Sequence, residues 1–243
     1  MANLNPHTTH VLAPECLDDF ALQPTSKFKL ESILDNTLPF PANGICGIIL
    51  YGLYGTGKTT MANLLPGLID TAKSDPNAQH IQPSRIRDTT EPNTDYYACA
   101  QGQNGAQITQ QIQNRTQLIS FNNAGFHFVI MDEVDNLTEA AQAGLRGAVE
   151  ELSLANDFVM TANEPERLSA AIRSRFLPVH FDFILTDDYL QELAVHLWEI
   201  AASEGYGDVD MYLLRAIARA NFPDIRKMIK ALQFELMTHQ KII

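Results

Sequence analysis

A short apolar run that leads straight into a glycine-rich loop is the feature that most constrains how this chain can fold. Residues 47–51 read Gly-Ile-Ile-Leu-Tyr, and the loop after them reads Gly52-Leu53-Tyr54-Gly55-Thr56-Gly57-Lys58-Thr59, which satisfies the pattern G-x-x-x-x-G-K-[ST]. Glycines let backbone N–H groups wrap a polyphosphate, and the N-terminus of a following helix adds donors and a partial positive charge. The sequence therefore predicts a buried strand, a phosphate-binding loop and a helix that begins at Lys58.

The side chains of this loop predict a site for ATP and Mg²⁺. We expect Lys58 to reach the β- and γ-phosphates and Thr59 to bind the metal ion. The residues assigned to nucleotide binding are Gly52, Tyr54, Gly55, Thr56, Gly57, Lys58, Thr59 and Thr60. The alternative is a glycine-rich turn that binds no ligand.

A second apolar run ends in two adjacent carboxylates. Residues 128–131 read Phe-Val-Ile-Met, and Asp132 and Glu133 follow them. A parallel strand would carry both acids to the carboxyl edge of its sheet, where ligands of α/β folds bind. We expect Asp132 to hold Mg²⁺ and Glu133 to orient and activate the attacking water. The alternative is a pair of acids at a solvated turn; Asp135 is expected at the surface or at a helix start.

Strand-like and helix-like segments alternate up to about residue 181, which predicts an α/β fold with a five-stranded parallel sheet covered on both faces. The expected strands are 47–51, 96–100, 126–131, 158–161 and 179–181. The expected helices are 28–38, 58–65, 106–117 and 138–154, with Pro66 ending the second and Thr138 capping the fourth. Residues 71–95 are polar and proline-containing, and are expected to form a surface excursion.

The pattern changes after residue 185, where strand signals stop. Helices are expected at 186–203, 208–220 and 223–238. We therefore expect an α/β nucleotide-binding domain at residues 1–184, of which residues 1–27 form an arm, and a helical domain at residues 185–243.

Composition and charge exclude several classes of protein. The net charge is −12, which excludes a polycation that holds nucleic acid by bulk charge. The three cysteines are widely spaced, which favours reduced thiols over a disulfide framework or a zinc site. Residues 1–12 do not resemble a signal peptide, and no apolar run approaches the ~18–20 residues that span a bilayer. We expect a cytoplasmic protein without a membrane contact.

Several motifs together resemble one family. Residues 132–146 are similar to the Walker B strand and following helix of AAA+ clamp-loader ATPase subunits, which include replication factor C-type small subunits and their phage counterparts. Thr161-Ala162-Asn163 resembles sensor 1, and residues 222–227 resemble sensor 2. Residues 172–176 resemble the Ser-Arg-Cys motif, with phenylalanine in place of the cysteine. The resemblance covers about residues 45–235.

This resemblance implies an AAA+ core, built on a five-stranded P-loop sheet, and a small C-terminal helical lid domain. It implies that Asn163 lies near the γ-phosphate, that Arg175 is an arginine finger for a neighbouring subunit's nucleotide, and that Arg226 folds over the phosphates. A guanidinium suits these roles because it is always charged and binds phosphate in a bidentate manner. Together with Lys58 and Glu133, these three residues are the candidate catalytic residues.

The predicted function is Mg²⁺-dependent hydrolysis of ATP to ADP and phosphate by a homo- or hetero-oligomeric ring that acts as a switch in DNA replication or repair. The expected partners are DNA and a sliding clamp or another replication protein. Because the sequence ends at Ile243, we expect no third, collar domain of the kind that clamp-loader subunits carry. The alternatives are an AAA+ helicase loader or protein remodeller, and a module that binds ATP without hydrolysing it. Residues 101–105 lack the aromatic side chain of a threading loop, and Glu133 disfavours the inactive module.

Overall fold

The computed structural model describes residues 14–20, 22–74, 81–90, 92–99, 105–115, 120–153, 155–182 and 185–239. Its helices and strands are, in chain order, η1 (Leu17–Asp19), α2 (Pro24–Leu34), β1 (Gly47–Tyr51), α3 (Lys58–Ser74), η3 (Pro83–Arg85), β2 (Thr94–Ala98), α4 (Gly105–Arg115), β3 (His127–Asp132), η4 (Val134–Asn136), α5 (Glu139–Leu152), β4 (Asn156–Ala162), η5 (Pro165–Arg167), α6 (Ala170–Arg173), β5 (Phe176–His180), α7 (Asp187–Ser203), α8 (Met211–Asn221) and α9 (Ile225–His239).

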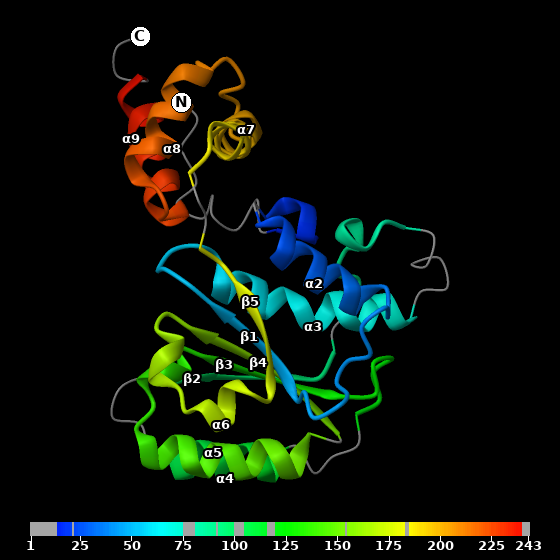
Figure 1. Ribbon diagram of the computed structural model, residues 1–243. Helices are drawn as coiled ribbons and strands as arrows, with labels where there is room; N and C mark the ends of the chain where they lie inside the picture. Colours follow the sequence, from blue (N-terminus) through cyan, green and yellow to red (C-terminus); the bar gives the residue numbers. More distant parts are fainter. Residues whose placement is uncertain are drawn as a thin grey trace. The chain divides into compact units, whose positions relative to one another are not determined.

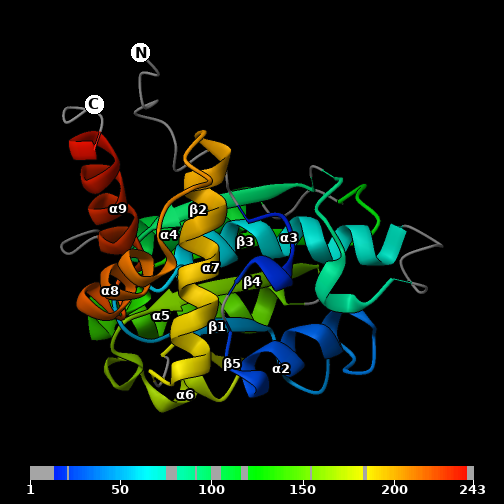
Figure 2. The same cartoon turned by 90° about the horizontal axis from the view of Figure 1, so that it is seen from above.

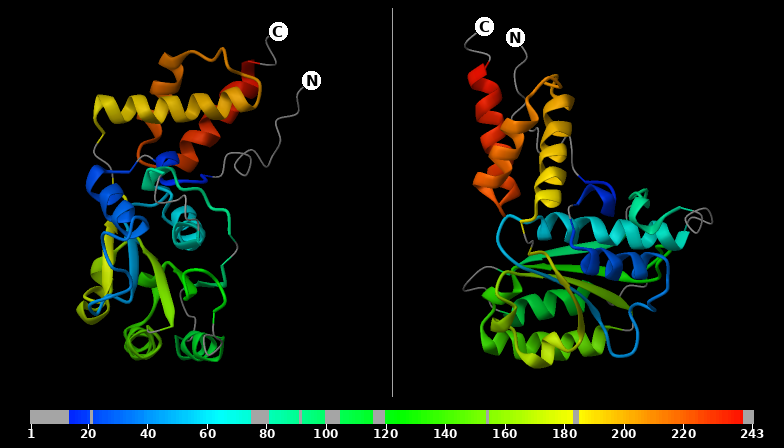
Figure 3. Two further views of the ribbon diagram at one scale, coloured as in Figure 1. Left: turned by 90° about the vertical axis from the view of Figure 1, so that its right-hand side faces the viewer. Right: turned by 45° about the horizontal axis from the view of Figure 1, so that its top comes forward.

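Five parallel strands form one sheet in the order β2-β3-β4-β1-β5. Helices α2 and α3 lie over one face of this sheet, and α4, α5 and α6 lie over the other (Figure 1, Figure 3). The predicted α/β class with a five-stranded parallel sheet is therefore confirmed. Strand β1 lies between β4 and β5, and ligands of such sheets bind at the carboxyl ends of strands around such a reversal of order.

The inner strands are apolar almost throughout because helices cover both of their faces. All seven residues of β4 and the first four of β1 are buried. On one face, Ile49, Val129 and Phe158 of the strands join Leu145 and Val149 of α5 in a single core cluster. Each large side chain buried in this way contributes roughly 1.5–3 kcal/mol. This core holds the strand ends that carry the candidate site.

The chain divides into two compact units. Unit 2 comprises Glu15–Gly52 and Lys58–Phe181 and contains the sheet. Unit 1 contains the loop residues Leu53–Gly57 and the segment that carries α7, α8 and α9. These three helices pack against one another (Figure 2), and the side chains of Thr186 and Asp210 cap the first two. The predicted run of helices at the C-terminal end is confirmed.

Helix α3 continues through Pro66 to Ser74, so the prediction that it ends near residue 65 is wrong. A proline in a helix interior removes a hydrogen bond and costs about 3 kcal/mol. The second half of α3 is nevertheless buried, with Leu68 fully inside and Ile69 only 2% exposed. Packing of these side chains against β3 and β4 outweighs the lost hydrogen bond.

Two further helix boundaries differ from the predictions. Helix α2 begins at Pro24 and ends at Leu34, whereas the sequence predicted residues 28–38. Proline suits the first helical position because its φ is already helical and its missing N–H is not needed there. Helix α8 begins at Met211 rather than at Asp208, because the Asp210 side chain accepts the capping hydrogen bond.

The predicted arm and surface excursion also contain regular structure. Within the predicted arm, residues 17–19 and 24–27 are helical, and residues 1–13 lie outside the described residues. Within the predicted excursion, residues 71–74 belong to α3 and Pro83–Arg85 forms a short 3-10 helix. The edge strands are displaced as well: β2 ends at Ala98, two residues early, and β5 begins at Phe176, three residues early. Strand pairing with a neighbour, and not apolar composition, sets these two ends.

The three cysteines are buried free thiols. Burial, assisted by the charge of Asp132, raises the pKa of Cys99 to about 12, so this thiol stays protonated at neutral pH. No helix in the described part of the chain is long and apolar enough to cross a membrane.

Near the start of β4, Asp157 is fully buried, and neither of its carboxylate oxygens has a hydrogen-bond partner among the described residues. Burial raises the pKa of Asp157 well above its usual value, and the charge of Lys73 opposes this shift only in part. Lys73 in turn lies over the ring of Phe126, with its Nζ 4.8 Å from the ring centre. The fold therefore contains an acid that prefers to be neutral.

This acid predicts a pH-dependent stability. Because the folded pKa is raised, the contribution of Asp157 to the unfolding free energy is greatest below its unfolded pKa of about 3.9 and falls as the pH rises from there through the folded pKa. The side chain of the variant Asp157→Asn does not ionise, so the variant does not lose stability in this way as the pH rises. We expect its advantage over the wild type to grow from about pH 4 upward, by about 1.4 kcal/mol for each unit by which the folded pKa is raised. Urea denaturation across this pH range measures the difference; a constant difference would contradict the interpretation.

Candidate functional site

Lys58 and Thr59 begin α3, directly after the glycine-rich loop. The Lys58 side chain is buried, with 6% of the residue exposed, and its Nζ donates a hydrogen bond to the carbonyl oxygen of Gly52 at 2.8 Å. The fold thus holds a buried cation at the carboxyl end of β1, where the first turn of α3 also presents backbone donors. Such a cation attracts the phosphates of a nucleotide.

Asp132 is the centre of a hydrogen-bond network in unit 2. Its Oδ1 accepts hydrogen bonds from the hydroxyls of Thr59 at 2.9 Å and Thr161 at 2.6 Å. Its Oδ2 accepts a hydrogen bond from the hydroxyl of Tyr96 at 2.7 Å. Thus α3, β4 and β2 each contribute one hydroxyl to the carboxylate at the end of β3. Thr59 and Asp132, the predicted metal ligands, are brought together, and their oxygens are the kind that Mg²⁺ prefers.

The roles of Thr161 and Tyr96 have no signal in the sequence. In the sheet, Thr161 pairs with Leu50 of β1, and Tyr96 pairs with Ile130 of β3, two residues before Asp132. Side chains two residues apart on a strand share a face, so Tyr96 reaches Asp132 only because β2 pairs in this register. Burial, followed by the hydrogen bond to Asp132, raises the pKa of Tyr96.

Glu133 shares Thr161 with Asp132 through its backbone N–H, but its side chain has a different partner. Its backbone adopts φ 56° and ψ 49°, the left-handed region, which is uncommon for a residue other than glycine. Its N–H donates to the Thr161 hydroxyl oxygen at 2.9 Å, and its Oε2 accepts a hydrogen bond from the Asn136 side chain at 3.1 Å. Two neighbouring acids are therefore held in different environments, as the predicted division of roles requires.

Of the two predicted positions of Asp135, the surface is wrong, since the residue is buried at 3% exposure, and the helix start agrees with its place in the first turn of η4. It lies within η4, and its Oδ2 accepts hydrogen bonds from the backbone N–H groups of Asn163 at 3.1 Å and Glu164 at 2.9 Å. The carboxylate therefore fixes the turn after β4 that carries Asn163. Sequence reasoning missed this positioning residue because the turn lies far away in the chain.

Removal of this carboxylate should destabilise the turn. We expect Asp135→Ala to lower the unfolding free energy by about 1–3 kcal/mol, because both N–H groups lose their acceptor. Asp135→Asn should lose less, since the amide oxygen can still accept. Denaturant unfolding of the two variants measures the difference; equal stability of Asp135→Ala and the wild type would contradict the positioning role.

Arg175, the predicted arginine finger, is bound within its own unit. Its guanidinium forms an ion pair with Glu150 of α5, and its Nη1 donates to the carbonyl oxygen of Ala171 at 2.5 Å. Its side chain is 30% exposed. None of these partners of Arg175 belongs to the Asp132 network, and its role at another subunit stays a prediction.

Arg226 and the loop residues Leu53–Gly57 lie in unit 1. The N–H of Ile225, at the start of α9, donates to the carbonyl oxygen of Gly55 at 3.0 Å. Gly55 has φ 78°, and a Cβ there would collide with Oδ1 of Asp224, so only glycine fits. Arg226 follows Ile225 directly, and its side chain is exposed. Within unit 1, the residue before the predicted sensor 2 arginine is therefore hydrogen-bonded to Gly55 of the glycine-rich loop.

The other loop side chains differ in their surroundings. Thr56 is buried, at 1% exposure, and its hydroxyl donates to the carbonyl oxygen of Leu53 at 2.9 Å, which stabilises the loop. Tyr54 is 63% exposed, and Thr60 is exposed on the first turn of α3. The structure thus gives Thr56 a structural contact and leaves Tyr54 accessible.

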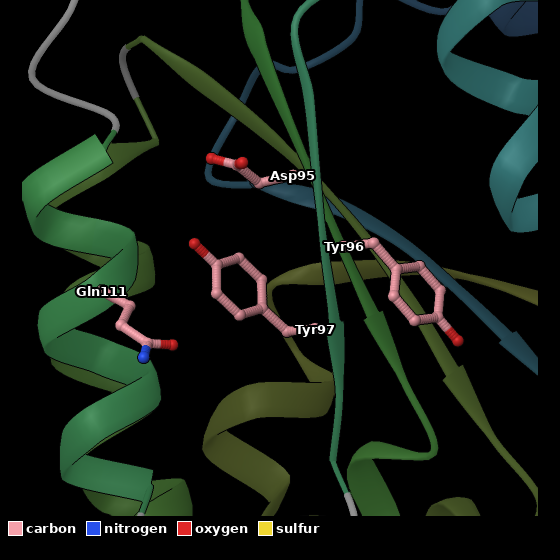
Figure 4. A pocket seen from close by; sticks show the side chains of 4 residues that line it. All are labelled: Asp95, Tyr96, Tyr97 and Gln111. Atoms are coloured by element: carbon pink, nitrogen blue, oxygen red, sulfur yellow. The ribbon is translucent and has the colours of Figure 1, made fainter.

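A pocket of about 310 Å³ lies beside β2 and is lined by Asp95, Tyr96, Tyr97 and Gln111. Figure 4 shows Tyr97 directed toward Gln111 of α4 and Tyr96 on the opposite side of the strand. None of the predicted site residues lines this pocket.

Sequence comparison finds relatives among proteins of DNA replication. The replication factor C small subunit of Thermoplasma acidophilum is 30% identical over 135 residues, which are 55% of this chain and 41% of that protein. The replication factor C small subunit of Thermofilum pendens is 29% identical over 222 residues, which are 90% of this chain and 59% of that protein. The chain therefore spans about half the length of these relatives.

A solved structure and a family model also match this chain. The chain resembles the RuvB Holliday junction branch migration motor of Thermotoga maritima, with a TM-score of 0.62, 21% sequence identity, and coverage of 95% of this chain and 67% of that one. At this identity the likeness shows the fold. The model of the ATPase family associated with various cellular activities (AAA) matches residues 48–181, more than half of the 243-residue chain. The glycine-rich loop and the acidic strand end lie within the matched segment, as does the five-stranded sheet apart from Gly47, and the chain belongs to the AAA family of ATPases.

Proposed function

We propose that this protein binds ATP with Mg²⁺, hydrolyses it to ADP and phosphate, and acts as a subunit of a clamp-loader-like switch in DNA replication. The observation that carries the proposal is the 2.9 Å hydrogen bond between the Thr59 hydroxyl and the Asp132 carboxylate. This contact joins the two oxygen donors that a nucleotide-bound magnesium ion requires at the end of a phosphate loop.

In this proposal, Lys58 and the loop Gly52–Gly57 bind the phosphates, and Tyr54 and Thr60 contribute to nucleotide binding. Thr59 and Asp132 hold Mg²⁺, which neutralises charge on the β- and γ-phosphates when it is bound. Glu133 accepts a proton as the oxygen of water bonds to the γ-phosphorus and the bond to the bridging oxygen breaks. The hydrogen bond from Asn136 orients Glu133 for this step.

Three further residues would recognise the γ-phosphate. Asn163 is held by the turn that Asp135 fixes, and Arg226 lies beside the residue that binds Gly55. Arg175 would act on the nucleotide of a neighbouring subunit, in a homo- or hetero-oligomeric ring. Loss of the γ-phosphate would then change the contacts at a subunit boundary, because a guanidinium binds strongly to a doubly charged group.

The replication role rests on similarity that extends beyond the AAA segment. The match to the Thermofilum pendens replication factor C small subunit covers 90% of this chain. We propose DNA and a sliding clamp or another replication protein as partners, in the cytoplasm. We also propose a switch between residues 1–184 and the helical lid at 185–243. Residues 183 and 184, the predicted junction, and residues 101–104 of the loop before α4 lie outside the described residues.

Two measurements test this function. ATP turnover should require Mg²⁺ and should rise when primer–template DNA is added, and light scattering should show assembly in the presence of a non-hydrolysable ATP analogue. Turnover that ignores DNA but responds to a protein partner would favour a helicase loader or remodeller instead. A protein that binds no nucleotide would refute the whole proposal.

A further inference from the structure

We infer that Tyr96 is a positioning residue for the magnesium site: its hydroxyl fixes the orientation of the Asp132 carboxylate from the edge strand β2. The inference rests on the proposed function, since it assigns Tyr96 to the same Mg²⁺–nucleotide site. The experiment below separates the failure of one from the failure of the other.

The geometry of Asp132 is the first argument. An ionised carboxylate has about four lone-pair positions. Thr59 and Thr161 both donate to Oδ1, at 2.9 and 2.6 Å, so these two bonds alone leave Oδ2 unrestrained. Tyr96 is the residue that binds Oδ2, at 2.7 Å. With both oxygens bound by described residues, the carboxylate plane is fixed, and these three bonds leave about one lone-pair position for a magnesium ion.

The position of Tyr96 is the second argument. Tyr96 is 48% exposed, yet its hydroxyl donates a hydrogen bond to the Asp132 carboxylate at the end of β3. An exposed tyrosine contributes little to the core, so packing alone does not explain this contact. The adjacent Tyr97 points to the other side of β2, toward α4 (Figure 4). The strand therefore carries two adjacent tyrosines on opposite sides, and the hydroxyl of Tyr96 is the one that contacts Asp132.

The expected effect follows from the role of outer partners of metal ligands. Loss of a group that orients a metal-binding carboxylate typically costs about 10–100-fold in metal affinity. Tyr96→Phe removes only the hydroxyl and keeps the ring. Nucleotide binding without metal depends on Lys58 and the loop, which Tyr96 does not touch in the described contacts.

The test is a Mg²⁺ titration of the binding of a fluorescent non-hydrolysable ATP analogue to the full chain. For Tyr96→Phe we expect the half-maximal Mg²⁺ concentration to rise by about tenfold, with affinity in EDTA unchanged. Tyr97→Phe is the matched control, because it removes the same group from the other face of the same strand, and it should titrate like the wild type. Thermal unfolding of both variants confirms that they fold.

Each outcome decides between the two claims. If Tyr96→Phe titrates like the wild type, or at lower Mg²⁺, the inference is refuted while the proposed function stands. If both tyrosine variants shift equally, the effect belongs to the strand and the positioning role is again refuted. If the wild type itself shows no Mg²⁺-dependent binding, the proposed function fails and the inference falls with it.

Discussion

Arg175→Ala is expected to slow ATP hydrolysis by the assembled protein by about 10³-fold or more, because an arginine supplied in trans stabilises the charge that develops on the γ-phosphate. Nucleotide affinity should change little, since the subunit that binds the nucleotide keeps its own Lys58 and phosphate loop. Steady-state phosphate release, measured at protein concentrations where assembly is complete, gives the rate. Arg173→Ala is the matched control, because Arg173 is an exposed arginine at the end of α6, two residues before Arg175.

A mixing experiment distinguishes action on a neighbour from action on the same subunit. Arg175→Ala subunits retain Glu133, and Glu133→Gln subunits retain Arg175, so mixed assemblies of identical chains contain some complete sites. Equal mixing should therefore restore part of the wild-type rate. If the mixture stays as slow as its components, or if the Arg175→Ala protein hydrolyses ATP at the wild-type rate, Arg175 is not a finger in trans.

The substitution Glu133→Gln is expected to have the second large effect on the rate of ATP hydrolysis. We expect hydrolysis to slow by about 10²–10⁴-fold, since the amide cannot take the proton of the attacking water. ATP binding should persist, because Lys58 and Asp132 are unchanged and the oxygen of the new amide can still accept the hydrogen bond from Asn136. Single-turnover hydrolysis and analogue binding, measured on one preparation, separate these effects. Undiminished turnover would show that Glu133 is not the base.

Glu164→Gln is the matched control for this carboxylate. Glu164 lies in the turn after β4, and its side chain pairs at 3.9 Å with Arg167 on the surface. Its neutralisation removes one negative charge from the same unit without changing a predicted site residue. We expect a rate within about twofold of the wild type, since exposed ion pairs are worth at most about 1 kcal/mol.

Local sequence patterns were sufficient to predict the strands and the glycine-rich loop of this fold. The loop needs a buried strand before it and a helix after it, and both are adjacent in the chain. Thr138 and Thr186 cap their helices through bonds to residues three positions ahead, which is also local information. These local predictions agree with the structure, although the starts of α2 and α8, which Pro24 and Asp210 also set locally, were predicted wrongly.

Other predictions failed where contacts between distant segments decide the outcome. Pro66 ends an isolated helix, but the burial of Leu68 and Ile69 keeps α3 intact. Asp135 was expected at the surface or at a helix start, and its burial was missed because its partners, the N–H groups after β4, lie 28 and 29 residues ahead. Tyr96 lies 36 residues before Asp132 and meets it only through the register of β2 on β3. No single-sequence pattern contains that register.

The hydroxyl of Thr161 has a consequence for how β4 can vary. This side chain is buried, at 1% exposure, in a strand whose neighbours are apolar, so valine would match it in shape. Its oxygen, however, receives the amide proton of Glu133 while its own proton goes to Asp132. This one hydroxyl thus connects Asp132, the proposed metal ligand, to the backbone of Glu133, the proposed base. Serine can replace threonine at this position in evolution or design, because it keeps the hydroxyl. Valine would fill the same space in the core but would remove the hydrogen bonds to Asp132 and from the Glu133 N–H.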